Sequence, residues 1–363
     1  MGDLQQLAQS VIQWGALISL LVFGVSLLVI VVVYLIDKTQ TTQTIRRNYP
    51  VVGRFRYLFE HLGGFFRQYF FAMDREELPF NRAERSWVYR AAKDVDTTIA
   101  FGSTRSLNQE GGAMFLNSAF PTLSEDVAEP QPITIGEISC KRPYTTKSII
   151  NVSGMSYGSI SSPAIRALSN GAREAGVWMN TGEGGLSPYH LEGGCDIVYQ
   201  IGTAKYGVRN EDGTLSDDKL REVSGHEQVR MFEIKMSQGA KPGKGGILPA
   251  IKVTEEISRI RGIPVGTDSI SPNGHEDIKS VGDLLDMIHR IREVTGKPVG
   301  FKMVVGQLEF FDDLFQEVHK RGIKSAPDFI TIDSADGGTG AAPQPLMDYM
   351  GMPLQESLPL IVN

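Results

Sequence analysis

Residues 328–343, DFITIDSADGGTGAAP, join a short apolar run to a segment that has almost no side chains. The run 328–333 is rich in β-branched and aromatic residues and ends at an aspartate, a pattern typical of a buried β-strand. Glycine and alanine dominate the residues that follow. Two interpretations are open: a tight turn, or a bare backbone surface against which a large flat ligand packs.

The sequence before this stretch alternates between strand and helix patterns. Strands are predicted at 148–155, 177–180, 231–237, 298–306 and 327–333, and helices at 161–176, 250–262, 280–296 and 308–322. This order indicates parallel strands covered by helices, in a doubly wound sheet or in a (β/α)8 barrel. The repeated units and the loops after the strands favour an α/β fold of the TIM-barrel type. In such a barrel the loops after the strands form the active-site face.

Charged residues in these loops suggest the chemistry. Lys235 alternates with apolar neighbours in its strand, so its side chain is expected to point into the barrel mouth, where it requires an anion. Lys241 follows in a glycine-rich loop, and the pair suits the N1–C2=O edge of a flavin together with a substrate carboxylate. Glu183, in TGEGG, is a candidate acid, base or orienting group, or a carboxylate that caps turn N–H groups. Lys244 fits a surface lysine better.

Composition excludes several classes of protein. A net charge of −6 and a pI near 5.6 argue against nonspecific nucleic-acid binding. The two cysteines, Cys140 and Cys195, are far apart, which excludes a disulfide scaffold and a cysteine-pair zinc site and fits a reducing compartment. The histidines do not approach metal-ligand spacing, and there is no P-loop, GxGxxG or catalytic-triad pattern. We therefore expect no metal site and no nucleic-acid partner.

Residues 15–36 are uncharged and mostly apolar, and are long enough for a bilayer core of roughly 30 Å. A cleaved signal peptide or a buried core helix are the alternatives, but residues 1–14 lack the basic start of a signal peptide. Basic residues follow the span, so the positive-inside rule places residues 1–14 outside the cytoplasm and everything after residue 37 inside it. A single-pass membrane protein with a cytoplasmic domain is expected.

Residues 37–147 form a lead-in region. Its first part, to residue 93, interleaves arginine with aromatic residues, and could lie on the anionic inner leaflet or pack its aromatic face on the main domain; the second is favoured. Residues 94–147 are rich in Gly, Pro, Ser and Thr and are expected to wrap the core irregularly.

Six ordered motifs carry a resemblance to a known family: GMSYGSIS, NTGEGG, KMSQGAKPGKGGILP, ISPNGHEDIKS, GFKMVVG and FITIDSADGGTGAAP. From about residue 48 onward the chain resembles the FMN-binding synthase domain of glutamate synthases, and more closely its stand-alone, membrane-anchored members. The resemblance implies that residues 148–363 form a (β/α)8 barrel that binds FMN. It also implies glutamate biosynthesis, in which 2-oxoglutarate and ammonia give an imino acid that receives a hydride from N5 of reduced FMN.

Carried over by motif, the resemblance assigns Lys235, Lys241 and Glu183 to catalysis, and Lys241 and Arg261 to the substrate. It assigns to the flavin Met155, Ser156, Asn180, Thr181, Lys235, Gln238, Lys302, Asp333, Gly337, Gly338 and Thr339.

Three departures from the family pattern stand out. Ile247 takes the place of a glutamine that holds 2-oxoglutarate, which leaves another oxo acid, an imine or an amine open as the substrate. The chain starts Met1-Gly2 without an amidotransferase cysteine, so an ammonia-supplying subunit and an electron-donor protein are expected partners. The chain ends at Asn363 before the closing strands and the iron–sulfur cysteines of the family. An incomplete barrel is therefore expected, with an inactive fragment or scaffold as a further alternative.

Overall fold

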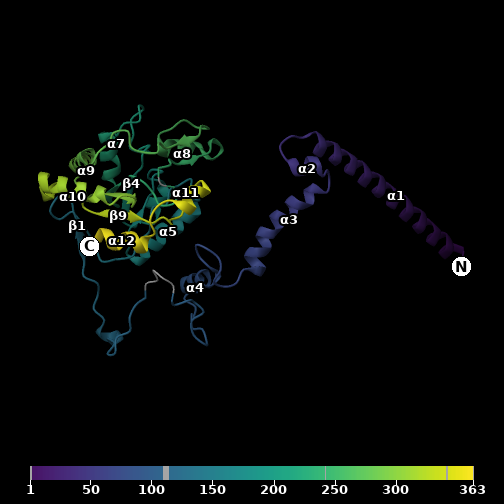
Figure 1. The fold of residues 1–363 in the computed structure, drawn as a ribbon, viewed down its shortest axis with the longest axis horizontal. Helices are drawn as coiled ribbons and strands as arrows, with labels where there is room; N and C mark the ends of the chain where they lie inside the picture. The colour runs from purple at the N-terminus through teal and green to yellow at the C-terminus, as the bar shows by residue number, and fades with distance from the viewer. Residues whose placement is uncertain (1, 109–113, 242, 341, 363) are drawn as a thin grey trace. The chain divides into compact units, whose positions relative to one another are not determined.

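The computed structural model describes residues 2–108, 114–241, 243–340 and 342–362, and the chain divides into two compact units, Met1–Ser106 and Leu107–Asn363. The first unit contains helices α1 (Gly2–Thr39), α2 (Thr44–Asn48), α3 (Gly53–Phe66) and α4 (Arg82–Ala92), with a π-helical turn η1 (Arg67–Phe71) after α3 (Figure 1). A capping box between Asn81 and Glu84 starts α4.

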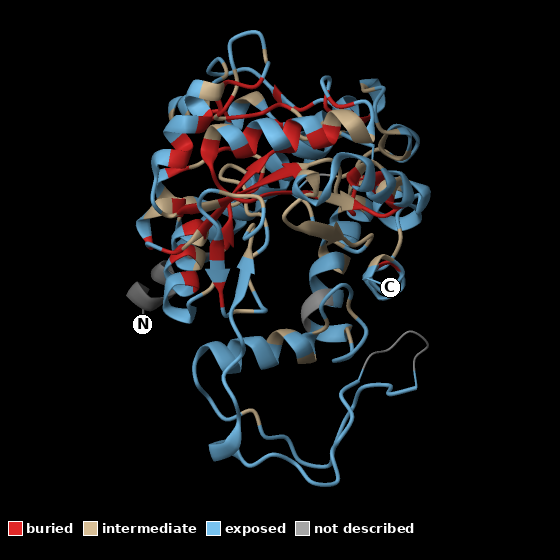
Figure 2. Cartoon of the chain, turned by 90° about the vertical axis from the view of Figure 1, so that its left-hand side faces the viewer, coloured by how far each residue is buried: buried red, intermediate tan, exposed pale blue. Residues whose placement is uncertain are grey.

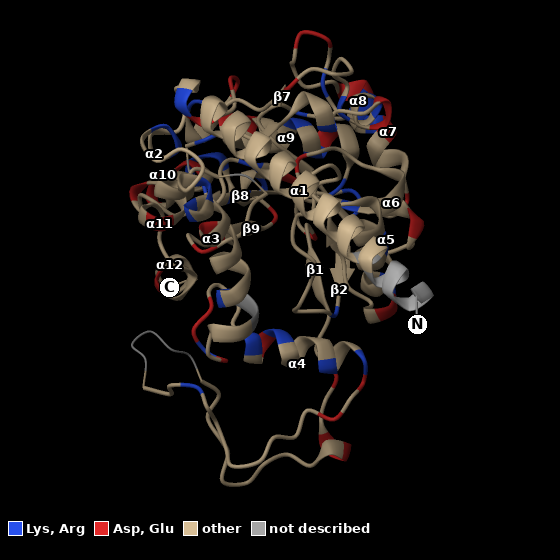
Figure 3. Cartoon of the chain, turned by 90° about the vertical axis from the view of Figure 1, so that its right-hand side faces the viewer, with Lys and Arg blue, Asp and Glu red and all other residues tan. Residues whose placement is uncertain are grey.

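Helix α1 is longer than the span expected from the sequence. Its segment Ile12–Thr39 is long and apolar enough to cross a membrane, and most of α1 carries no charged side chain (Figure 3). A signal sequence or a core helix meets the same test of length and composition. The structure therefore supports one N-terminal apolar helix.

The second unit is built on a curled parallel sheet. Its strands β3 (Met179–Asn180), β4 (Ile197–Ile201), β5 (Val229–Lys235), β8 (Val299–Val304) and β9 (Ile330–Asp333) pair in that order. All four pairings are parallel. Helices α5 (Ser162–Ala175), α7 (Asp217–Gly225), α9 (Val281–Thr295) and α10 (Glu309–Arg321) alternate with the strands. The α/β prediction is confirmed: this sheet is consistent with part of a TIM barrel.

Buried apolar side chains hold the helices on the sheet. Ile165, Leu220, Ile288 and Leu314, one from each of these helices, belong to the same core cluster as Phe232 and Phe301 of the sheet. Figure 2 shows this buried layer running through the strands and the inward sides of the helices. Serine side chains cap the starts of α5, α7 and α9, and glycines in the left-handed region end α5 and α9.

Shorter elements surround the sheet. They are a 3-10 turn η2 (Ser124–Asp126), the hairpin of β1 (Ile133–Ile135) and β2 (Tyr144–Thr146), α6 (Pro188–Glu192), the antiparallel pair β6 (Ile247–Leu248) and β7 (Ser269–Ile270), η3 (Ala250–Lys252), α8 (Glu255–Arg261), η4 (Ile323–Ser325), α11 (Gln344–Tyr349) and α12 (Leu354–Val362).

Two predicted elements were wrong in detail, and two observed elements were missed. The run 148–155 makes only a single parallel bridge, between Val152 and Met179, because the side chain of Asn151 takes the N–H of Trp178. The helix predicted over 250–262 is split, since Thr254 caps a new start at α8. Strand β4 and helix α7 were not predicted at all.

Candidate active site

The residues singled out in the sequence gather at the carboxyl ends of the parallel strands. Asn180 ends β3, Lys235 ends β5 and Asp333 ends β9, while Lys302 lies within β8. Because these strands are parallel, their carboxyl ends meet at one edge. The loops that follow them bring the other predicted residues to the same edge. Pro242 and Ala341, which fall in two of the quoted motifs, lie outside the described residues.

Glu183 forms the centre of a charged cluster. Its Oε1 lies 2.9 Å from Nζ of Lys235, and both side chains are largely buried. Gly246 faces the same cluster: a Cβ added there would lie 3.3 Å from Glu183 Oε1 and 3.9 Å from Lys241 Nζ. The structure thus brings Glu183, Lys235 and Lys241 together.

The electrostatics of the cluster favour an ionised Glu183. Burial alone raises the pKa of its carboxyl, but the positive charges of Lys235, Lys241 and Arg261 outweigh burial and leave that pKa below its usual value. Burial, helped by the charges of Lys235 and Lys244, lowers the pKa of Lys241. Glu183 is thus suited to orienting cations rather than to donating a proton.

Arg261, at the end of α8, reaches the same place from another side. Its Nη1 donates to Ser269 Oγ at 2.9 Å and its Nη2 to the carbonyl of Tyr157 at 3.2 Å. Its guanidinium also lies over the ring of Tyr206, 5.1 Å from the ring centre. Burial lowers the pKa of Arg261. Its Nε is buried and has no hydrogen-bond partner among the described residues.

A small cavity joins Arg261 to the charged cluster. It is lined by Ser156, Ser159, Glu183, Tyr206, Gly246, Ile247, Leu248, Arg261, Ser269 and Ser271. Ile247 is half exposed, with 50% of its surface accessible. The side chain that departs from the family pattern therefore borders the same space as Arg261.

Asp333 ties two loops together at the other side of the edge. Its Oδ2 lies 3.4 Å from Nζ of Lys302 and accepts the N–H of Gly239 at 3.1 Å. Gln238, next to Gly239, accepts a hydrogen bond from Lys235 Nζ. The loop that carries Lys241 is thereby fixed to both β5 and β9.

The residues after β3 pack on the loop 153–159. Gly182 has a φ of +65°, and a Cβ there would overlap Ser156. Asn180 Oδ1 accepts the N–H of Gly182 at 2.9 Å, and Thr181 is fully buried. Ser187 and Met155 hold the ring of His190, whose Nε2 lies 2.9 Å from the Met155 carbonyl. Burial lowers the pKa of His190, so this histidine is a neutral structural support.

The loop after β9 contains Gly337, Gly338 and Thr339. A Cβ at Gly337 would lie 3.0 Å from Asp333 Oδ1, but one at Gly338 would meet no heavy atom within 4 Å. The described contacts do not join Thr339 to the Glu183 cluster. Of Gly337 and Gly338, the second therefore has open space where a Cβ would lie.

Sequence reasoning missed two buried groups near the cluster. Glu233, two residues before Lys235 on β5, accepts hydrogen bonds from Asn180 and Gln200. His275 contacts the carbonyl of Lys235 through Nε2 at 3.0 Å, and its buried Nδ1 has no partner among the described residues. The signal for Glu233 was its spacing: it alternates with Lys235 in the same strand.

The cysteines lie apart in the fold. Cys140 Sγ contacts the carboxylate of Asp328, and Cys195 Sγ lies 3.7 Å from Ser169 Oγ. Within the described parts of the chain, no group of three His, Cys, Asp or Glu side chains is placed to hold a metal ion.

Comparison with known proteins explains this arrangement. The family model for the conserved region in glutamate synthase matches residues 108–363. The chain belongs to the glutamate synthase family. Glutamate synthase large subunit-like protein YerD of Bacillus subtilis is 37% identical over 95% of this chain and 73% of its own length.

Two further relatives of this glutamate synthase-family chain match a smaller part of it. An archaeal-type glutamate synthase (NADPH) of Thermotoga maritima is 41% identical over 57% of this chain and 38% of its own length. The archaeal glutamate synthase (NADPH) of Methanocaldococcus jannaschii is 36% identical over 58% of this chain and 38% of its own length. The chain therefore spans less than half the length of these two relatives.

The residues at the barrel edge fit the FMN that this family usually binds. The buried, unpartnered polar atoms Arg261 Nε and His275 Nδ1 point to hydrogen-bonding groups outside the described chain. Lys235 and Lys302 place cations at the strand ends, where a flavin ring and its substrate require them. Gly338 leaves room for a flat group against the backbone.

Proposed function

We propose that this chain is a membrane-anchored, FMN-dependent oxidoreductase that converts 2-oxoglutarate and ammonia to glutamate. One observation carries the proposal: Lys235, Lys241 and Arg261 gather around the single carboxylate of Glu183 at the strand ends. Lys235 and Arg261 both act on the one carboxylate of Glu183 in a buried place, and anionic groups of a cofactor and a dicarboxylate substrate would balance the positive charge that this carboxylate does not.

The flavin would rest on the residues that follow the strands. When bound, FMN supplies the hydride that reduces the imino carbon of the substrate. Lys235 and Gln238 would hold the N1–C2=O edge, with Glu183 fixing the lysine. The remaining flavin contacts are proposed for Met155, Ser156, Asn180, Thr181, Lys302, Asp333, Gly337, Gly338 and Thr339.

Arg261 and Lys241 are proposed to hold the substrate. Two of the five N–H groups of Arg261 donate to Ser269 and Tyr157, and a further one would donate to a substrate carboxylate that enters the cavity. Lys241 has a lowered pKa and so gives up a proton more readily than an exposed lysine. It would therefore bind the second carboxylate or deliver the proton that the reduced nitrogen requires.

A second candidate keeps the flavin and changes the substrate to another oxo acid, imine or amine. The observation that favours it is Ile247, which borders the same cavity as Arg261 and offers no hydrogen bond. Under both candidates α1 anchors a cytoplasmic domain, and a donor protein and an ammonia-supplying subunit act as partners.

The visible spectrum of the detergent-solubilised full chain tests the cofactor, with the released compound identified by mass. Flavin absorption bands are expected, with FMN as the released compound, and a colourless folded protein would refute the proposal. Lys235→Met should release FMN, whereas Lys244→Met, at the rim of the same loop, should retain it. The flavin is then photoreduced without oxygen, and its reoxidation is followed after a substrate is added. Under the first candidate, 2-oxoglutarate with ammonia should reoxidise it. Reoxidation only by other oxo acids or imines would favour the second candidate.

A further inference from the structure

Helix α3 has a strongly divided surface. Exposed apolar residues lie on one side of it and charged residues on the other, as their spacing at 100° per residue requires. The apolar side consists of Phe55, Leu58, Phe59, Phe65 and Phe66, and all five are exposed. Phe70 and Phe71 of η1 extend this row and are also exposed. On the charged side Arg56 and Glu60 form an ion pair at 2.8 Å.

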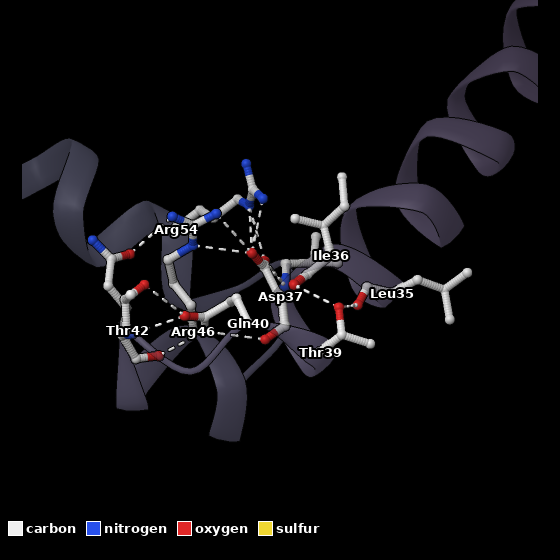
Figure 4. Close-up of polar contacts among 10 residues, drawn as sticks. Leu35, Ile36, Asp37, Thr39, Gln40, Thr42, Arg46 and Arg54 are labelled. Carbon is white, nitrogen blue, oxygen red and sulfur yellow. Dashed lines mark hydrogen bonds and ion pairs between the residues drawn. The ribbon is translucent and has the colours of Figure 1, made fainter.

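A buried carboxylate fixes the start of α3 to the end of α1. Asp37 is fully buried, and Figure 4 shows the groups that surround it. Arg46 Nε donates to its Oδ1 at 3.0 Å, Arg54 Nη2 donates to the same oxygen at 2.8 Å, and the N–H of Val51 donates to its Oδ2 at 3.0 Å. A carboxylate paired with two arginines in this way holds the turn closed, because opening it would break these charge-assisted hydrogen bonds.

The position of this Asp37 cluster determines at what depth relative to a bilayer α3 begins. The apolar segment of α1 ends at Thr39, so the cluster lies where a membrane-spanning α1 would leave the hydrocarbon core. Helix α3 begins at Gly53, next to Arg54, and therefore starts at the same level. With 14 residues it is too short to span a bilayer, which takes about 20.

The charge around α3 suits an anionic leaflet. Residues 37–72 contain six Lys or Arg against two acidic residues, Asp37 and Glu60. Arg46 and Arg54 form ion pairs with Asp37. Lys38, Arg47 and Arg67 are exposed. Basic side chains near an anionic surface are attracted to it, so these exposed groups favour binding to an anionic leaflet.

We propose that α3 and η1 lie in the headgroup layer of the leaflet where α1 ends, with the phenylalanine row buried in lipid and the Asp37 cluster setting the angle. The partner is the anionic bilayer itself. This inference rests on the proposed anchoring by α1 and adds a second membrane contact to it. The catalytic unit would then be joined to a helix held along the surface, rather than hanging from a single span.

The test uses the full chain in vesicles of phosphatidylcholine with one quarter phosphatidylglycerol. A small fluorescent amino acid replaces Phe59 on the apolar side, Glu60 on the charged side, or Val25 in α1, so that the native cysteines stay in place. Nitroxide lipids quench groups in the bilayer, and iodide quenches groups in water. The probe at 59 should be quenched by lipid about threefold or more over the probe at 60, and the reverse is expected with iodide.

Each outcome decides between the anchor and this inference. If the probe at 25 is quenched by lipid and the probe at 59 is not, α1 spans the membrane but α3 lies elsewhere, and the inference is wrong. Protection of position 59 from both quenchers would mean that the row packs on protein. If the probe at 25 escapes lipid quenching, the anchor and the inference both fail. Asp37→Asn should reduce lipid quenching at 59 and leave it unchanged at 25.

Discussion

The buried carboxylate of Glu233 should be the most sensitive polar group beneath the active site. It lies in β5 with only 2% of its surface exposed. Asn180 of β3 and Gln200 of β4 donate to its Oε1 at 2.8 and 2.7 Å, and Thr331 of β9 donates to its Oε2 at 2.6 Å. One side chain thus joins four of the five strands and fixes the amide of Asn180, whose oxygen holds the loop of Glu183.

Two substitutions separate hydrogen bonding from packing at this position. Glu233→Leu leaves the amides of Asn180 and Gln200 without their acceptor, and each stranded donor costs about 1–3 kcal/mol, so unfolding free energy should fall by about 3–5 kcal/mol. In Glu233→Gln one oxygen can still accept from both amides, and the hydroxyl of Thr331 can turn to accept from the new NH2 group. The loss should then be about 1 kcal/mol.

Thermal unfolding of the solubilised chain, followed by circular dichroism, measures the difference. For a unit of this size about 1 kcal/mol corresponds to roughly 2–4 °C, so Glu233→Leu should unfold about 8 °C or more below the native chain and Glu233→Gln about 3 °C below it. Glu222→Leu on the exposed side of α7 is the control and should change little. Equal losses for the two Glu233 variants would refute the argument, because the donors would then not depend on an acceptor at this position.

Four other predictions follow from single residues. Burial lowers the pKa of Lys297 from 10.5 to about 8, so between pH 8 and pH 10.5 the unfolded chain binds more protons than the folded chain. The unfolding free energy of the native chain, measured by urea titration and compared with that of Lys297→Met, should therefore rise with pH in that window. The rise should be at most about 1.4 kcal/mol per pH unit. Burial raises the pKa of Cys140 from 9.0 to about 11, so at pH 8 its thiolate should be about 100-fold scarcer than that of an exposed cysteine. Alkylation of Cys140, followed by mass spectrometry, should be slower by the same factor until the chain unfolds. Gly182→Ala combines a φ of +65° with an overlap on Ser156 and should cost at least about 2 kcal/mol in urea unfolding. Gly338→Ala should leave apoprotein unfolding unchanged but speed flavin loss, measured by released fluorescence.

Much of the candidate site could be predicted because parallel strands place their carboxyl ends together. Strands β5, β8 and β9 each have a clear apolar run that ends in a charged or glycine-rich loop. Together with the predicted strand at 177–180, these strands place Lys235 and Glu183 at the same edge, although the two are far apart in sequence; their direct contact was not predicted. Helices α9 and α10 lie within their predicted ranges, since an apolar stripe and a final glycine define each.

Strand β4 could not be recognised in this way. All five of its residues are buried, so it has no alternation of apolar and polar side chains that would reveal a strand. It contains a tyrosine and a glutamine, and only its pairing with β3 and β5 defines it as the second strand of the sheet. The role of Glu233 depends on the same strand, because Gln200 of β4 is one of its donors.

Two glycines in the bare loops after the strands are required by chain crossing rather than by a ligand. A Cβ at Gly239 would overlap the carbonyl of Ser334, and one at Gly245 would overlap that of Ser271, so these two glycines are required wherever the neighbouring loops cross. Gly338 differs from both: no described atom lies near its missing Cβ, and its backbone does not occupy the left-handed region. Within residues 328–343 the two interpretations apply to different glycines. Gly337 donates its N–H to the carbonyl of Ser334 in a turn, and the proposal of a flat ligand depends on the open backbone at Gly338.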